Sequence, residues 1–211
     1  LDGYASFAIG FPHYFRGQFE AAANEWRNAA EKLDISADYW VAANSIRCEG
    51  LARGQMGQFE EADRCLQKSI AQFRSRGDTN SLGYALRNLS IAYMRIGQYD
   101  QVYALCREAL SISSRMGDQW SIVRALERLG VADALGRGDH EHAAVILGST
   151  EFIREDLGSP LAPGEIDDYR QALEKLQQEL AASRLRELWE TGRSMSIDQV
   201  AAFALDESGE T

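Results

Sequence analysis

The residues best suited to chemistry in this chain form the run Asp139-His140-Glu141-His142. Imidazole and carboxylate groups bind metals such as zinc. However, residues two apart on a helix point in divergent directions, and the sequence supplies no third ligand at a telling distance. We therefore expect a solvent-exposed start of a helix here, and no metal or other cofactor.

The remaining reactive side chains are scattered. His13 stands alone near Pro12 and Tyr14, which suggests a structural role. Three cysteines share no metal-binding spacing: Cys48, Cys65 and Cys106. Acidic pairs begin predicted helices, where they favour the helix dipole: Glu60-Glu61 and Asp167-Asp168. Because no GxSxG elbow, HExxH motif or phosphate-binding glycine loop is present, we expect no catalytic residue and no enzyme.

Composition narrows the class of protein. The 211 residues are 45% hydrophobic and carry a net charge of −10, which opposes direct nucleic-acid binding. No apolar run approaches the roughly 20 residues of a membrane span, and no signal peptide opens the chain. The odd cysteine count favours a reducing, cytoplasmic compartment. Since the chain begins at Leu1 already in helical sequence, we expect a fragment of a longer protein.

A turn that recurs about every 40 residues is the central pattern. Its four copies are Gly17-Gln18-Phe19-Glu20, Gly57-Gln58-Phe59-Glu60, Gly97-Gln98-Tyr99-Asp100 and Gly138-Asp139-His140-Glu141. A second register half a period away repeats in the same way, at Gly77-Asp78, Gly117-Asp118 and Gly158-Ser159. Each glycine suits the left-handed residue after a helix, and Asp78 and Asp118 can cap the next helix.

Between the turns, apolar residues recur at spacings of three and four, so each period predicts two antiparallel helices. Neither helix can bury its apolar stripe alone, and the repeats must therefore stack. We predict an all-α fold with repeats at about 1–36, 37–77, 78–117 and 118–158. C-terminal capping helices should follow over 159–206, with a disordered tail at 207–211.

At this point the sequence resembles the tetratricopeptide (TPR) family over roughly residues 3 to 157. The third repeat carries the family's packing positions at Leu86, Leu89, Tyr93, Gly97, Tyr99, Ala109 and Leu110, while Ala22 and Ala62 occupy the small site after the turn. The resemblance implies a right-handed superhelix of helix pairs, a TPR-like α-solenoid. The period exceeds the usual length of about 34 residues, as in the kinesin light chain and bacterial regulator variants. Pro12 predicts a kink or a late start in the first helix.

The tail carries a second resemblance. We expect a helix from about Gly164 to Leu180, a second one ended by Gly192-Arg193-Ser194, and a short last helix that Ser196 caps and that reaches Leu205. The tail is similar to the end of the TPR region in bacterial STAND-type signal-transduction ATPases, including LuxR-type and AfsR-type transcriptional regulators. The matching residues are Ala143-Ala144, Leu147-Gly148, Arg154, Leu157-Gly158, Pro160-Leu161, Pro163, Tyr169, Trp189, Gly192-Arg193 and Ser196. This implies a sensor and scaffold arm beside an ATPase that lies outside these residues.

In-phase positions on the leading helix of each pair predict a binding surface, because these helices line a concave groove in stacked repeats. The candidate residues are Tyr4, Phe7, Asn44, Arg47, Tyr84, Arg87, Asn88, Arg124 and Arg128. Arginine offers a forked donor pair for carboxylates, and asparagine can hold an extended peptide backbone. The alternative, that these are ordinary solvated helix faces, stays open.

Two functions compete. The first is a non-catalytic interaction module and regulatory sensor within a bacterial signal-transduction ATPase or transcriptional regulator, whose partner is a protein, a small ligand or another domain of the parent. The second is a free-standing TPR adaptor that binds short peptides in its concave groove. The sequence leaves open whether the concave or the convex face is used and whether the chain forms oligomers.

Overall fold

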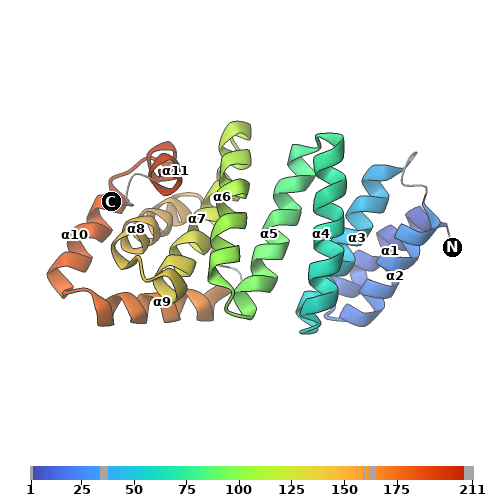
Figure 1. Cartoon of the computed structure of the whole chain (residues 1–211), viewed down its shortest axis with the longest axis horizontal. Helices are drawn as coiled ribbons and strands as arrows, with labels where there is room; N and C mark the ends of the chain where they lie inside the picture. The colour runs from blue at the N-terminus through green and yellow to red at the C-terminus, as the bar shows by residue number, and fades with distance from the viewer. Residues whose placement is uncertain (1, 34–37, 159, 162–164, 207–211) are drawn as a thin grey trace. The chain divides into compact units, whose positions relative to one another are not determined.

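The computed structural model describes residues 2–33, 38–158, 160–161 and 165–206. All regular elements within these ranges are helices, as Figure 1 shows. The predicted all-α repeat class is therefore confirmed. The predicted disordered tail at 207–211 and the predicted helix start at Gly164 lie outside the described residues.

The helices fall into two compact units, which together contain every repeat turn. The first unit, Leu1–Tyr93, contains α1 (Gly3–Phe15), α2 (Phe19–Lys32), α3 (Tyr39–Gln55), α4 (Phe59–Arg76) and most of α5 (Thr79–Arg95). The second unit, Met94–Thr211, contains α6 (Tyr99–Met116), α7 (Gln119–Ala132), the π-helical turn η1 (Asp133–Arg137), α8 (His140–Asp156), α9 (Ile166–Glu179), α10 (Ala182–Arg193) and α11 (Ile197–Leu205).

The glycine turns have the backbone that the repeat predicts. Positive φ angles between 59° and 75° occur at Gly17, Gly57, Gly77, Gly97, Gly117, Gly138 and Gly158. The caps also form, because the carboxylate of Asp78 accepts from the Ser81 amide at 3.0 Å and that of Asp118 from the Ser121 amide at 3.1 Å. Both turn predictions are confirmed, and they place consecutive helices antiparallel.

A second set of small residues sets the spacing within the helix pairs. A Cβ atom on Gly10 would lie 2.3 Å from the Trp26 indole nitrogen. On Gly50 and Gly130 it would lie 2.8 Å from a leucine of the following helix. These three glycines are in phase with the 40-residue period, and the fourth position holds the fully buried Ser90. The turn pattern in the sequence gives no sign of this row, because its members lie inside helices.

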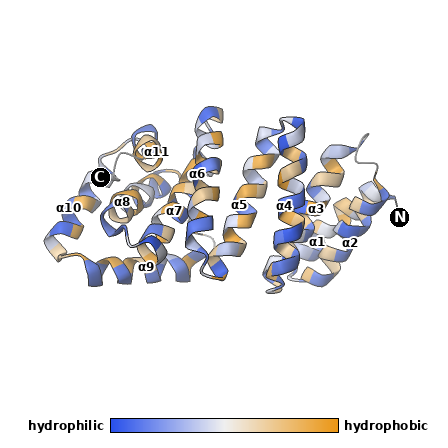
Figure 2. Ribbon diagram, in the orientation of Figure 1, coloured by the Kyte–Doolittle hydropathy of each residue, from blue (hydrophilic) through white to orange (hydrophobic). Residues whose placement is uncertain are grey.

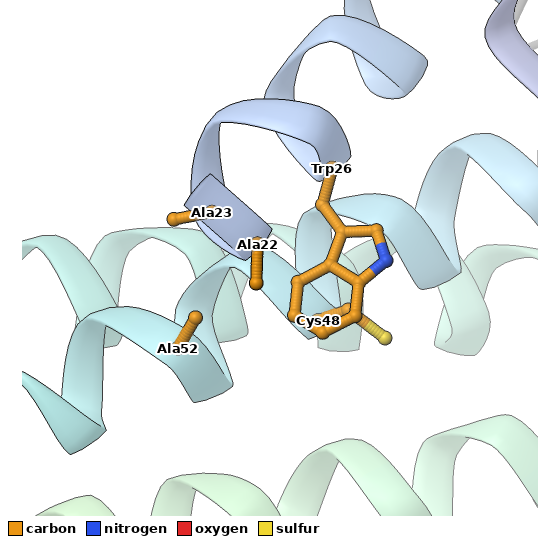
Figure 3. Packing of buried hydrophobic residues seen from close by; sticks show 5 residues of the cluster. All are labelled: Ala22, Ala23, Trp26, Cys48 and Ala52. Atoms are coloured by element: carbon orange, nitrogen blue, oxygen red, sulfur yellow. The ribbon is translucent and has the colours of Figure 1, made fainter. Parts of the chain in front are cut away.

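The core of the first unit forms where α2 meets α3. Figure 3 shows Trp26 beside three alanines and a cysteine, all at most 2% exposed: Ala22, Ala23, Cys48 and Ala52. Cys48 and Cys106 are buried, whereas Cys65 is partly exposed. Hydropathy alternates around the individual helices in Figure 2. Helices such as α2, α4 and α6 are amphipathic, and their buried residues recur at the three- and four-residue spacing of one helix face.

The first helix corrects one expectation. Helix α1 begins at Gly3, where the carboxylate of Asp2 accepts from the Ala5 amide at 2.8 Å, so a late start is wrong. Pro12 lies near the end of the helix, where the missing amide leaves only one earlier carbonyl without its partner.

The tail helices pack onto the last repeats within the second unit. Helix α10 lies chiefly against α8, and α11 contacts α6, α7 and α8. Ser196 and Gln199 form the predicted cap of α11 as a reciprocal capping box. None of the described helices combines the length and apolar character that a membrane crossing needs.

Candidate partner-binding site

An aromatic surface joins α1 to α3 in the first unit. Phe7 packs edge-on against Phe11, with ring centroids 5.2 Å apart, and against Trp40 at 6.3 Å. Tyr4 is 51% exposed and Trp40 50%. Spacings of three, four and seven place these side chains on one face of each helix. We call this the aromatic face: Tyr4, Phe7 and Phe11 of α1 with Trp40, Asn44 and Arg47 of α3.

Hydrogen bonds hold the aromatic face in place. The Tyr4 hydroxyl donates to the Asp38 carboxylate just before α3, and this bond raises the pKa of Tyr4. Behind the face, the Trp26 indole nitrogen donates to the Phe7 carbonyl at 3.1 Å. Helix α1 is therefore connected to α3 and to α2 through polar groups as well as through ring contacts.

Arg47 is positioned by a buried amide. Asn44 is 4% exposed, and its Nδ2 donates to the Trp40 carbonyl at 3.0 Å. Its Oδ1 accepts from Arg47 Nε at 2.9 Å. Within the described residues, no carboxylate lies within ion-pairing distance of Arg47. The structure thus orients this guanidinium without neutralising it.

The in-phase residues of α5 form a smaller group. The Arg87 guanidinium lies 5.2 Å from the centre of the Tyr84 ring, and Tyr84 is 37% exposed. Asn88 is 4% exposed, and its Nδ2 has no hydrogen-bond acceptor among the described residues. Of the predicted residues, the structure brings together Tyr4, Phe7, Asn44 and Arg47, and separately Tyr84 and Arg87.

Arg124 and Arg128 take a different place, inside the second unit. Arg124 is 6% exposed and contacts Glu127 at 2.9 Å and Glu165 at 3.3 Å. Arg128 is 7% exposed and pairs with Glu165 as well. Arg154 contacts Glu127 at 3.0 Å. We call these residues the ionic cluster: Arg124, Glu127, Arg128, Arg154 and Glu165. Both predicted guanidinium groups therefore bond within the protein, and this arrangement gives no support to their role in partner binding.

Burial governs the charges of this ionic cluster. It raises the pKa of Glu127 above its ordinary value, although Arg124 and Arg154 act in the opposite direction. Burial also raises the pKa of the neighbouring Tyr169 to about 12, with Glu151 adding to the shift. Glu165 supplies the carboxylate that reaches two arginines, and the sequence analysis missed it because it belongs to the tail rather than to the repeat.

The Asp139-His140-Glu141-His142 run begins α8, and its second histidine is not solvated as predicted. His142 Nδ1 lies 2.8 Å from the Asp133 carboxylate on η1, and its ring packs 4.8 Å from that of Phe203 on α11. Asp139 caps the helix through the His142 amide at 3.2 Å. No metal-binding cluster of histidine, cysteine or acidic residues occurs in the described ranges. The run is structural, since it links η1, α8 and α11.

Comparisons with known proteins bear on the fold alone. No protein-family model and no curated protein sequence matches the chain. Among solved structures, the chain is similar to the nearly identical TPR-like repeats of a Podosopora anserina protein assigned to the kinesin light chains. The TM-score is 0.65 at 17% identity, over 92% of this chain and 94% of that one. A point variant of those repeats gives a TM-score of 0.65 at 17% identity, over 90% and 92%. Taken with the helix pairs and the glycine turns, these likenesses show that the chain has the fold of a TPR-like helical repeat.

Proposed function

We propose that this chain is a non-catalytic scaffold that binds a protein partner through the aromatic face. The observation that carries the proposal is Arg47, a guanidinium that Asn44 orients and that no internal carboxylate neutralises among the described residues. Half-exposed Trp40 and Tyr4 belong to the same aromatic face. Tryptophan, tyrosine and arginine are the residues that dominate binding energy at protein interfaces.

The aromatic face favours an extended segment that carries a carboxylate and apolar side chains. A carboxylate can accept both donors of the Arg47 fork, while the rings of Phe7 and Trp40 offer apolar contact. The chain as a whole carries a net charge of −10. An acidic segment would be repelled by most of the surface and attracted to this guanidinium, which makes binding selective.

The finer proposal is a regulatory sensor arm in a cytoplasmic bacterial signal-transduction ATPase or transcriptional regulator. Its support is the tail, in which the Gly192-Arg193 and Ser196 positions resemble that group. The partner is then another domain of the parent protein. The native reading frame separates this proposal from the free-standing adaptor, because an upstream P-loop ATPase supports the regulator and its absence supports the adaptor.

A peptide-display selection against the whole chain tests the binding face. A selected peptide is titrated by fluorescence anisotropy against the native protein and against Arg47→Ala combined with Arg87→Ala. We expect the double variant to abolish binding while the thermal transition stays within a few degrees. Arg47→Lys keeps the charge but loses the fork, so it should recover only part of the affinity.

Arg64→Ala is the matched control, because Arg64 is a 73% exposed arginine of the same unit whose ion pair with Glu61 lies on α4. It should leave peptide affinity unchanged. If peptides bind the double variant as tightly as the native chain, the aromatic face is not the binding site. If the double variant unfolds, these arginines are structural, and the proposal is wrong in its choice of residues.

A further inference from the structure

A cavity of about 500 Å³ lies between α9 and α10 in the second unit. Its lining is mainly apolar and includes Leu173 and Leu176 from α9, Leu180 just after α9, Leu185 and Trp189 from α10, and Glu151 from α8. Apart from Leu176, the leucines are only partly covered by protein. Leucine side chains here face a hollow rather than a packed neighbour.

The link between the two helices explains the hollow. Glycine turns at Gly17, Gly57 and Gly117 return the chain directly onto the previous helix. In contrast, Leu180 (φ −111°, ψ 140°) and Ala181 (φ −59°, ψ 141°) are both extended, so α10 leaves α9 at an angle and packs against α8 instead. Tyr169, Ala172 and Leu176 of α9 are buried against other helices, but partly exposed Leu173 lacks the partner helix that the repeat pattern would supply.

The Trp189 wall of the cavity is held rigidly. Its indole nitrogen donates to Glu151 Oε2 at 3.0 Å, and Arg193 donates to the same oxygen at 3.2 Å. Helices α8 and α10 also touch backbone to backbone. A Cβ atom on Gly148 would lie 2.7 Å from the Trp189 carbonyl oxygen, and one on Gly192 would lie 2.0 Å from that of Val145. The wall is thus preformed, as small-molecule sites usually are.

Size and polarity together indicate the occupant. The volume lies within the range of about 300–1,000 Å³ that holds drug-sized molecules. The lining residues span 173–177 on α9 and 182–190 on α10, or about 6 and 12 Å at 1.5 Å per residue. A typical partner helix of three turns measures roughly 16 Å and is too long for this hollow. Trp189 and Arg193 already engage Glu151, and the other polar lining residues, Gln177, Arg186 and Glu190, are exposed to solvent. Recognition inside the hollow therefore rests mainly on apolar contact.

We propose that this cavity is a binding site for a compact, largely apolar organic molecule, which bridges α9 and α10. A bound molecule provides the packing contacts that are missing because the link is extended. It thereby stabilises the angle between α9 and α10. The cavity shares no residue with the aromatic face, so the test of ligand binding in the cavity is independent of partner binding at the aromatic face. It gives the scaffold a place to sense a small ligand.

The test is a titration of the whole chain with the neutral fluorescent probe N-phenyl-1-naphthylamine. We expect saturable binding of one probe per chain and energy transfer from tryptophan. Leu173→Phe combined with Leu185→Phe fills the space with larger rings and should weaken binding at least about tenfold, the scale set by steric fit in an apolar pocket. Circular dichroism verifies that this variant is folded.

Leu157→Phe is the matched control, since Leu157 is a 40% exposed leucine of the same unit that does not line the cavity. It should leave probe affinity unchanged. If the native chain shows no saturable binding, or if the filled variant binds the probe as tightly, the proposal is overturned. If the filled variant does not fold, Trp189→Phe replaces it. Probe binding with undiminished tryptophan energy transfer in that variant then counts equally against the site.

Discussion

Helices α3 and α7 occupy equivalent positions in the repeat, yet the arginines predicted to bind a partner have opposite environments on the two helices. On α3, Arg47 bonds to Asn44 and has no carboxylate partner among the described residues. On α7, Arg124 and Arg128 are at most 7% exposed and pair with carboxylates inside the second unit. The repeat places all three arginines on leading helices, but a later part of the chain covers only the α7 residues.

Glu165 accounts for much of the difference. It lies just before α9 and contacts both Arg124 and Arg128, while the Pro160 carbonyl accepts from Arg124 at 2.7 Å. No comparable carboxylate reaches Arg47 in the described part of the first unit. A periodic position therefore sets which face a residue occupies, and contacts distant in sequence decide whether that face is open.

Removing a carboxylate from the ionic cluster should have the largest effect and tests the difference between the two arginine environments most directly. Glu127→Ala leaves Arg124 and Arg154 without their shared partner in a buried site. We expect the free energy of unfolding to fall by about 3–5 kcal/mol. Arg47→Ala removes a partly exposed arginine with its hydrogen bond to Asn44 and a weak one to the Cys48 sulfur, so it should cost about 1 kcal/mol.

Urea denaturation followed by circular dichroism measures both losses. Glu127→Gln serves as the control, because it keeps the shape of the side chain and removes only the charge. Equal losses for Glu127→Ala and Arg47→Ala would show that the two arginine environments do not differ energetically.

A smaller effect tests what the two regions share. Gly57 in the first unit and Gly138 in the second have φ angles of 74° and 75°, and no side chain crowds either position. Valine fits badly at positive φ, so Gly57→Val and Gly138→Val should each cost roughly 1–3 kcal/mol. Because the strain is local to the backbone, the two losses should be similar.

Asparagine tolerates the left-handed region better, and the Asn variants at both positions should therefore lose less stability than the valine variants. The same denaturation experiment compares them. A loss confined to one of the two turns would mean that tertiary surroundings, rather than backbone geometry, determine the cost.

The smallest effect is a pH dependence that belongs to the second unit. Burial lowers the pKa of His142, but the hydrogen bond and charge of Asp133 outweigh it, so the net shift is upward. A raised folded-state pKa means that this stabilisation is complete below the unfolded value of about 6.5 and is lost as pH rises through the folded value.

We therefore expect the melting temperature to decline between about pH 6 and 8 in the native chain. His142→Gln should flatten that decline, whereas the control His140→Gln should preserve it. Helix α3 contains no histidine, so hydrogen exchange should show the pH-dependent change in α8 and α11 and not in α3. Retention of the full decline by His142→Gln would contradict this assignment.

The sequence by itself determined the periodic features of this protein. Positive φ at Gly97, capping by Asp78 and Asp118, and the capping box at Ser196 all depend on residues within a few positions of one another. Such local conformational preferences are encoded in short stretches of sequence, and the same stretches recur in each 40-residue repeat. The all-α class and the helix pairs could be predicted for this reason.

Only the tertiary structure decided which of these periodic residues are open. His142 lies against Phe203, Gly192 sits inside the last turn of α10 against Val145, and Glu165 reaches back to α7. Each contact joins a repeat helix to the tail, which breaks the period. Burial and charge pairing depend on these nonlocal neighbours, and so the ionic cluster and the α9–α10 cavity emerge only from the folded chain, whereas Tyr4, Phe7, Asn44 and Arg47 of the aromatic face follow from the period.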